Sequence, residues 1–352
     1  MMSKLLLLPT CLALLLATAW FTWELSVRDV FIGLVLAVAF LAYLRRRAGA
    51  ALLPAQGKFV FITGCDSGFG HATAKYLDAL GIQVFAGCLF PDGEGASLLS
   101  ADCSDKLRVI PLDVTKQETV DAAMATIMQS TGDEGLWGVV NNAGILRASE
   151  LEITPMETFQ QHLDVNLLGQ IRVVQATLPL LRKSEGRIVS INSTNSYFYM
   201  PVFGAYGISK AAAEMFSNVL RLEMKKWGIK VITIHPGGFK TGLLSTNSSF
   251  QQKCYEQLTP ELKKYYTPEY FHRFLDNMDT GPTLPTDLTP VCSAVTRGLL
   301  ERVPSTNYRC GMLANTMVRS VQWLPTALFE YLVCNGEFNK APTLNPDGTK
   351  KD

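Results

Sequence analysis

Short apolar segments alternate with amphipathic ones between about residues 58 and 236. Six segments are rich in apolar and β-branched residues, which predicts six strands: KFVFITG, QVFAGCL, RVIPLDV, GLWGVVNN, RIVSIN and KVITIHPGG. Between them, HATAKYLDALG and residues 117–129, 156–181 and 206–227 show helical periodicity. Nearly continuous apolar strands separated by helices indicate a parallel sheet with both faces covered. The predicted fold class is therefore α/β, a doubly wound parallel sheet.

The regular alternation ends near residue 240, where polar and proline-rich stretches surround a short helix up to about residue 290. This segment is rich in aromatic and aliphatic side chains: Phe250, Tyr255, Leu258, Leu262, Tyr265, Tyr266, Tyr270 and Phe271. Two interpretations stay open. The side chains could wall an apolar ligand pocket, or they could simply pack the extra helix against the domain.

A different pattern precedes the first strand. Residues 5–23 form an uncharged, apolar run long enough to cross a bilayer, and a second, shorter run at 30–44 ends in three arginines. A cleaved signal peptide is the alternative, but the second run directly behind the first weakens it. We predict a membrane anchor of one or two spans at 1–50, a catalytic domain at 51–335 and a polar tail at 336–352. The arginines favour a cytosolic orientation for everything that follows them.

Composition narrows the partners. The net charge is +1 and the chain has no basic stripe, which gives no support for nucleic-acid binding. The eight cysteines are scattered, and neither they nor the four histidines have metal-ligand spacing. We therefore expect reduced thiols facing the cytosol and no metal site.

The first predicted strand ends in TGCDSGFG and leads directly into a helix. Gly64, Gly68 and Gly70 would let the backbone turn tightly and approach a pyrophosphate at the helix N-terminus. Asp66 would repel a further phosphate on the ribose, and no basic residue ends the second strand, which favours NAD over NADP. The acid usually expected there to bind the ribose is missing, because Cys88 occupies that position.

Two spacings in NSTNSYFYMPVFGAYGISK indicate catalysis. Ser193 precedes Tyr206 by thirteen residues, and Lys210 follows it by four, so Tyr206 and Lys210 lie on one face of the predicted helix. A tyrosine pKa is ordinarily about 10, and a neighbouring ammonium or a positive nicotinamide favours the phenolate. Tyr206 could then accept the proton of an alcohol while Ser193 holds its oxygen. Each residue alone could be structural, but the set at these spacings indicates a dehydrogenase.

Five motifs in chain order resemble the short-chain dehydrogenase/reductase family. They are the glycine loop TGCDSGFG, NNAG after the fourth strand, the asparagine of DVNLLG, the serine with YGISK, and PGGFKT after the sixth strand. The resemblance extends from about residue 58 to residue 304 and implies a Rossmann-type fold with NAD as the cofactor.

The resemblance also implies a role for each matching residue. The implied catalytic residues are Ser193, Tyr206, Lys210 and Asn166, with Asn166 binding a water that links Lys210 to solvent. Asp113 would contact the adenine. The implied cofactor-binding residues are Gly64, Asp66, Ser67, Gly68, Phe69, Gly70, Asp113, Val114, Asn142, Ala143, Gly144, Tyr206, Lys210, Pro236, Gly237 and Thr241.

Within that family, the segments KYLDALGIQVFAG, LPLLRKSEGR and MFSNVLRLEMKKWGIKV resemble the branch of 17β-hydroxysteroid dehydrogenases, and FGAYGISKAA resembles the 11β-hydroxysteroid enzymes. The resemblance implies NAD-dependent oxidation of an apolar steroid alcohol, most closely at a 17β-hydroxyl, by an enzyme of the endoplasmic reticulum membrane with its catalytic domain in the cytosol. An 11β-hydroxysteroid or a retinol is the alternative substrate, and a homodimer stays open. An alternative of another class is a membrane-tethered binding protein without catalysis.

Overall fold

The computed structural model describes residues 27–244, 247–268, 270–271, 284–311 and 314–334. The chain divides into two compact units, residues 1–52 and 53–352. Helix α2, Val27–Gly49, belongs to the first unit and contains the second predicted apolar run. Across the described part of the chain, no helix combines the length and apolar character needed to span a membrane. The first predicted run, 5–23, and the predicted tail, 336–352, lie outside the described residues.

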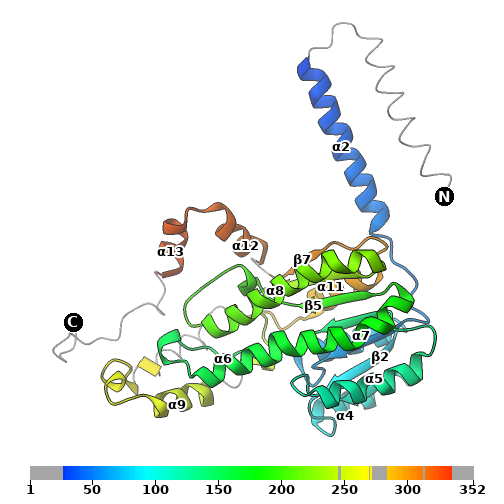
Figure 1. Cartoon of the computed structure of the whole chain (residues 1–352). Helices are drawn as coiled ribbons and strands as arrows, with labels where there is room; N and C mark the ends of the chain where they lie inside the picture. The colour runs from blue at the N-terminus through cyan, green and yellow to red at the C-terminus, as the bar shows by residue number, and fades with distance from the viewer. Residues whose placement is uncertain (1–26, 245–246, 269, 272–283, 312–313, 335–352) are drawn as a thin grey trace, which may run out of the picture. The chain divides into compact units, whose positions relative to one another are not determined.

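The second unit is built on a seven-stranded parallel sheet with the order β3-β2-β1-β4-β5-β6-β7 (Figure 1). The strands are β1 Phe59–Thr63, β2 Gln83–Cys88, β3 Leu107–Pro111, β4 Gly138–Asn141, β5 Arg187–Ile191, β6 Lys230–Pro236 and β7 Asn307–Cys310. The six predicted strands are all present, and β7 adds a seventh beyond the predicted set. The order reverses between β1 and β4, which is where doubly wound sheets bind their ligands.

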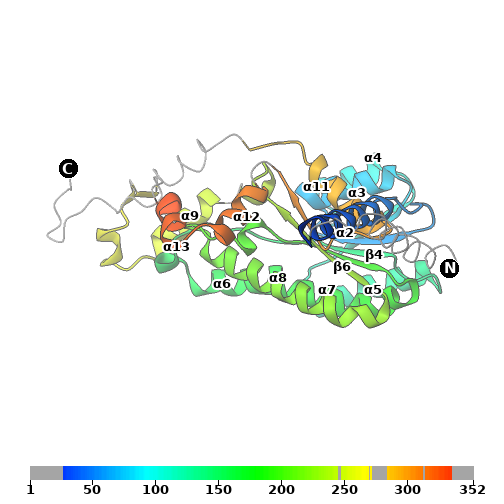
Figure 2. The same ribbon diagram turned by 90° about the horizontal axis from the view of Figure 1, so that it is seen from above.

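Helices cover both faces of the sheet, as the view from above shows (Figure 2). One face carries α3 Gly68–Ala79, α4 Glu94–Asp102 and α11 Thr289–Leu300, and the other carries α5 Gln117–Thr131, α7 Gln170–Ser184 and α8 Gly204–Met224. Two apolar clusters fill the two interfaces, and strand residues alternate between them: Val60 and Ile62 belong to one, Phe59 and Phe61 to the other. The doubly wound α/β prediction is confirmed.

The helix predicted at 156–181 is interrupted in the structure. Helix α6, Met156–Leu163, passes through a π-helical turn, η3 Asp164–Gly169, before α7 begins. The helix passes close to the loop after β3 here, since a Cβ on Gly169 would lie 2.7 Å from Val114. The turn holds Asn166, and such π-bulges often mark functional positions.

The remaining elements lie beyond the carboxyl ends of the strands or join the main helices. They are η2 Leu151–Ile153, η4 Thr194–Ser196, η5 Lys225–Trp227, η6 Gly242–Leu244, α9 Asn247–Gln257, η7 Leu262–Lys264, α12 Ala314–Trp323 and α13 Thr326–Cys334. The aromatic segment after residue 240 packs mainly on itself. Phe250, Leu258, Tyr266 and Phe271 form a buried cluster with Ile153.

Candidate active site

The glycine-rich loop joins β1 to α3 at the carboxyl edge of the sheet. Gly64 and Gly68 have left-handed φ angles of 72° and 60°. A Cβ on Gly64 would lie 2.8 Å from the Cα of Ala143, and one on Gly70 would lie 2.2 Å from the carbonyl oxygen of Gly64. Only glycine fits these positions, so the loop backbone can approach a pyrophosphate at the start of α3. The side chain of Ser67, the N-cap, makes no hydrogen bond to this helix and does not compete for that place.

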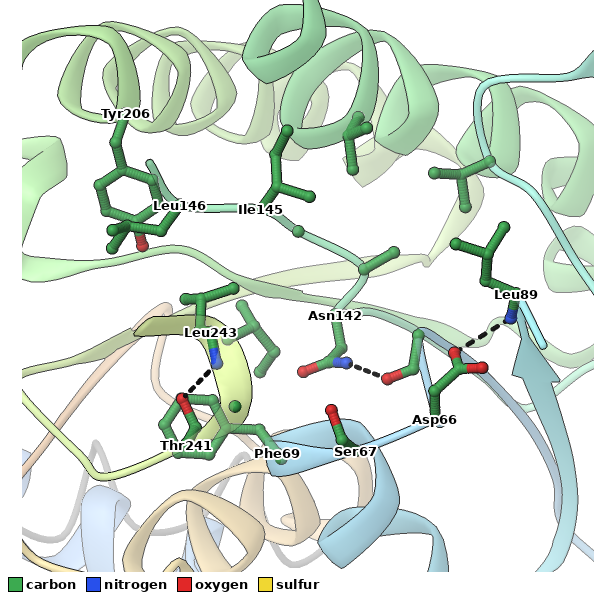
Figure 3. A pocket seen from close by; sticks show the side chains of 18 of the residues that line it. Asp66, Ser67, Phe69, Leu89, Asn142, Ile145, Leu146, Tyr206, Thr241 and Leu243 are labelled. Atoms are coloured by element: carbon green, nitrogen blue, oxygen red, sulfur yellow. Dashed lines mark hydrogen bonds between the residues drawn. The ribbon is translucent and has the colours of Figure 1, made fainter. Parts of the chain in front are cut away.

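The Asp66 carboxylate reaches from this loop to the end of β2. It accepts a hydrogen bond from the backbone N–H of Leu89 at 3.0 Å (Figure 3) and another from the backbone N–H of Phe90 at 2.8 Å. An acid therefore stands at the end of the second strand after all, supplied by the loop and not by position 88. Cys88 is buried, and burial raises the pKa of its thiol to about 12. The expectation of a missing acid at this place was wrong because it considered only the residues of the strand.

The segment after β4 is held against the glycine loop by hydrogen bonds. The hydroxyl of Thr63 accepts from the N–H groups of Asn142, at 3.1 Å, and Ala143, at 3.0 Å. The Asn142 side chain donates to the carbonyl oxygens of Thr63 and Gly64, each at 2.9 Å. These contacts fix the two loops that face each other where the strand order reverses. Thr63 is not among the predicted site residues. The one signal in the sequence that could have pointed to it is a hydroxyl group at the end of a predicted strand.

The segment after β3 forms another wall of the cavity, where an adenine was predicted. Asp113 accepts hydrogen bonds from the N–H, at 3.0 Å, and the hydroxyl, at 2.7 Å, of Thr115. Lys116 lies 3.7 Å from the same carboxylate. Leu112 and Val114 line the cavity on either side of Asp113 and offer apolar surface for a flat base.

Tyr206 and Lys210 lie in the first turns of α8, as the spacing predicted. Tyr206 is buried, and its hydroxyl points into the cavity beside Leu146 (Figure 3). The Lys210 ammonium is also buried; it lies 5.8 Å from the centre of the Tyr206 ring and donates to the carbonyl oxygen of Ile191 at 2.9 Å. That carbonyl ends β5, so the lysine joins the catalytic helix to the central sheet.

Burial dominates the ionisation of this pair. Burial raises the pKa of Tyr206 to about 12, and a hydrogen bond with Ser193 acts against the rise. Burial lowers the pKa of Lys210 to about 8. Desolvation of the phenolate sets the direction of the Tyr206 pKa in the protein by itself, so the predicted stabilisation of the phenolate by Lys210 and a bound nicotinamide stays a prediction.

Ser193 follows β5 and begins the short helix η4. It is buried, its backbone is extended, and its hydroxyl accepts from the N–H of Asn195 at 3.1 Å. Ser193 is also hydrogen-bonded to Tyr206, so two side chains that are thirteen residues apart in the sequence lie next to each other. Such a pair can hold and deprotonate a hydroxyl group.

The side chain of Asn166, in the π-helical turn, is hydrogen-bonded within the protein. Its side-chain oxygen accepts from the N–H of Ile145 at 2.8 Å, and its amide donates to the Ile145 carbonyl at 3.0 Å and to Ser209 at 2.9 Å. The side chain therefore fastens the segment after β4 to α8. Its predicted role of binding a water near Lys210 stays a prediction.

These walls enclose a cavity of about 390 Å³. The predicted residues that line it are Gly64, Asp66, Ser67, Gly68, Phe69, Asp113, Val114, Asn142, Ala143, Gly144, Tyr206, Lys210 and Thr241. Five predicted residues do not line it: Gly70, Asn166, Ser193, Pro236 and Gly237. Gly70 lies behind the loop and supports it. Ser193 does not line the cavity itself but is hydrogen-bonded to Tyr206, which does. Pro236 ends β6, and the N–H of Gly237 donates to the Cys310 carbonyl at 2.9 Å.

The apolar surface of the cavity includes residues outside the predicted set, besides Phe69 and Val114. Leu146, Val165 and Leu243 line it, whereas the described residues of the aromatic segment do not. Within that part of the chain, packing of the extra helix is therefore the better of the two earlier interpretations. Arg147 also lines the cavity and extends into a second pocket of about 290 Å³ beside Phe250.

A family model described as short chain dehydrogenase matches residues 58–252. Three relatives illustrate the range of similar proteins. Estradiol 17-beta-dehydrogenase 2 of Rattus norvegicus is 38% identical over 81% of this chain and 76% of that protein. D-beta-hydroxybutyrate dehydrogenase, mitochondrial, of Bos taurus is 40% identical over 75% and 80%. Retinol dehydrogenase 7 of Rattus norvegicus is 39% identical over 82% and 92%.

Solved structures share the fold. A short-chain dehydrogenase from Streptomyces avermitilis has a TM-score of 0.63 at 25% identity and covers 78% of this chain and 96% of its own. One from Burkholderia cenocepacia, in complex with NADP, has a TM-score of 0.61 at 20% identity and covers 80% and 99%. The glycine cradle, the acid at the end of β2 and the apolar wall after β3 fit a nicotinamide dinucleotide cofactor.

The close approach of Gly70 to Gly64 generates a prediction. In Gly70→Ala, a Cβ 2.2 Å from the Gly64 carbonyl must push the loop away, so NADH affinity should fall at least about tenfold, or 1.4 kcal/mol. The measurement is titration of NADH fluorescence. Gly207→Ala in α8 is the matched control, since its Cβ would meet nothing closer than 3.8 Å and should leave the affinity unchanged. Equal NADH affinity in both variants would contradict the cradle described above.

Proposed function

The chain belongs to the short-chain dehydrogenase family, and on that premise we propose that it oxidises a hydroxysteroid to a ketosteroid with NAD, at the 17β-hydroxyl. The coarser activity is established by the family and the relatives: the chain is an oxidoreductase that acts on a CH–OH group. The observation that supports the steroid is an apolar wall of Leu146 and Leu243 beside the buried Tyr206. An 11β-hydroxysteroid or a retinol is the alternative within the same chemistry.

The side chains divide the reaction between them. Ser193 holds the substrate hydroxyl, and Tyr206 accepts its proton. Bound NAD would supply the acceptor for the hydride of the carbinol carbon and a positive nicotinamide that favours the tyrosinate. Lys210 keeps a cation beside Tyr206, and its pKa of about 8 lets it change protonation near neutral pH. In the protein by itself, burial raises the pKa of Tyr206 to about 12 and so favours the protonated form, and the positive nicotinamide of bound NAD would act against that rise.

Arg147 supports a second candidate, the oxidation of a small hydroxy acid. It lines the cavity, its guanidinium lies 5.4 Å from the centre of the Phe250 ring, and among the described residues no carboxylate forms an ion pair with it. A guanidinium at the edge of an apolar site binds a carboxylate well. One relative is a hydroxybutyrate dehydrogenase, which supports the same candidate. The apolar wall favours the steroid.

A substrate panel with Tyr206→Phe tests the proposed function. Membranes that contain the protein should reduce NAD with estradiol or testosterone at a higher kcat/KM than with cortisol, retinol or 3-hydroxybutyrate. Tyr206→Phe keeps the packing of the ring but removes the proton acceptor, so turnover should fall by at least about 1,000-fold while NADH affinity stays within twofold. A variant that keeps a tenth of the activity would refute the assigned role of Tyr206. Turnover with none of the alcohols would favour the non-catalytic alternative.

The position of Asp66 carries the proposed preference for NAD. A carboxylate at the end of β2 can accept hydrogen bonds from ribose hydroxyls but repels a 2′-phosphate, so kcat/KM with NAD should exceed that with NADP at least about tenfold. Asp66→Arg should narrow this ratio. Asp66→Asn is the control: it removes the charge without adding a cation and should narrow the ratio less. Equal efficiency with both cofactors in the unmodified protein would overturn the preference.

We further propose that the N-terminal apolar runs anchor the protein in the endoplasmic reticulum membrane, with the dehydrogenase domain in the cytosol. Helix α2 exposes large apolar side chains, among them Phe31, Leu36 and Phe40, which supports a lipid contact. The three arginines at 45–47 support the orientation. The protein should remain in the pellet after carbonate extraction and show no mobility shift on treatment with an N-glycosidase. A glycan lost in Asn247→Gln would place the domain in the lumen, and release by carbonate would refute the anchor.

A further inference from the structure

A buried acid and a buried histidine lie directly behind Ser193. Glu214 belongs to α8 and His235 to β6, and both are almost fully buried. Their side chains approach to 3.5 Å between Nε2 of His235 and Oε2 of Glu214. Burying ionisable groups destabilises the folded state unless the groups are paired and hydrogen-bonded. A buried pair beside the catalytic serine is therefore a candidate for a function.

Both groups hold the turn that carries Ser193. Nδ1 of His235 lies 3.2 Å from the carbonyl oxygen of Ser193. Glu214 accepts from the side-chain amide of Asn192 and from the hydroxyl of Tyr197, each at 2.6 Å. Residues before and after the serine are thereby fastened to one buried pair. The Tyr197 ring also packs against the imidazole, with 5.3 Å between ring centres.

The partners of His235 show which ring nitrogen carries a proton. A carbonyl oxygen only accepts, so Nδ1 donates to Ser193. Nε2 lies 3.1 Å from the hydroxyl of Thr233, which is also hydrogen-bonded to the side chain of Asn307. Burial lowers the pKa of His235, while Glu214 and the Ser193 carbonyl act against that shift and Arg309 adds to it. A neutral imidazole with its proton on Nδ1 therefore holds the Ser193 carbonyl beside the Glu214 carboxylate.

Glu214 also connects the serine to the other catalytic side chains. It follows Lys210 by four residues and Tyr206 by eight, on one face of α8. Three consecutive residues at the end of β5 are thus held from this face and its partner: Lys210 binds the Ile191 carbonyl, Glu214 binds Asn192, and His235, which pairs with Glu214, binds Ser193.

We propose that Glu214 and His235 are positioning residues for the dehydrogenase reaction: they fix the Ser193 turn relative to α8, so that the serine hydroxyl meets the substrate oxygen beside Tyr206. This proposal rests on the proposed function. The pair contacts neither substrate nor cofactor, and it acts only through the placement of Ser193. A displacement of about 1 Å at a reacting group can lower the rate about 100-fold, which sets the expected size of the effect.

The experiment measures steady-state kinetics and NADH affinity in His235→Phe, His235→Gln and Glu214→Gln. His235→Phe fills the space without a donor, so kcat should fall about 30- to 100-fold while NADH affinity stays within twofold. His235→Gln can still donate to the Ser193 carbonyl and should recover at least a third of the kcat of the unmodified enzyme. Thr296→Val, which loses a buried hydrogen bond within α11 and none to the Ser193 turn, is the control and should keep full activity.

A double-mutant cycle with Ser193→Ala separates positioning from general damage. In the Ser193→Ala background, His235→Phe should cost less than a further twofold in kcat, because its effect passes through the serine. Additive losses in the cycle, or an unchanged kcat in His235→Phe, would overturn the proposal.

A readout that needs no turnover keeps the proposal distinct from the proposed function. The N–H of Ser196 donates to the Ser193 carbonyl at 3.1 Å, and the N–H of Tyr197 donates to Thr194 at 3.0 Å. Hydrogen exchange of these amides, followed by mass spectrometry, should be faster in His235→Phe and Glu214→Gln and unchanged in Thr296→Val. Faster exchange without turnover in the unmodified protein would refute the proposed function only. Unchanged exchange with normal unfolding temperatures would refute the positioning role.

Discussion

The buried hydrogen bond between the Lys210 ammonium and the carbonyl of Ile191 is the interaction on which the site depends. A cation without a water shell must find an acceptor inside the protein, and the last carbonyl of β5 supplies it. The bond fixes both the rotation of α8 and its height above the sheet. The direction of Tyr206 follows from that placement, because it lies one helical turn before the lysine. The cost of burying this cation is visible in its lowered pKa.

The same sheet edge explains why the cofactor loop and the catalytic residues meet. The strand order reverses between β1 and β4, and the loops that follow these strands diverge to open a cavity. The hydroxyl of Thr63, at the end of β1, accepts hydrogen bonds from the NNAG segment. In the other direction, the side-chain amide of Asn142 donates to the carbonyl oxygens where the glycine loop begins. A parallel sheet brings these carboxyl ends to one edge, although they lie far apart in the chain.

Side chains that contact no ligand hold much of the site. The Asn166 side chain joins the segment after β4 to α8 by hydrogen bonds. His162 holds the same segment at Arg147, whose backbone N–H lies 3.1 Å from Nε2 of the imidazole. Glu214 and His235 hold the segment after β5. Each of these groups is buried and hydrogen-bonded, so each can set a backbone position with little freedom. The geometry at Tyr206 is therefore a property of three neighbouring strands and one helix together.

The sequence by itself determined six of the seven strands, four helical segments between them and the chemical character of the site. Apolar periodicity is a local property, and the spacing of Tyr206 and Lys210 is a direct consequence of one helical turn. The glycines of the first loop were readable because only glycine permits their backbone angles and close approaches.

Only the tertiary structure decided what depends on contacts between distant segments. It placed Asp66 at the end of β2, made Asn166 a clip at a π-helical turn, and packed the aromatic segment upon itself. It also showed that desolvation, which no spacing reveals, raises the pKa of Tyr206. Glu214 and His235 are twenty-one residues apart and unremarkable in the chain. They become a pair because α8 packs beside β6. Both side chains are buried there, so each must find hydrogen-bond partners among the groups around it.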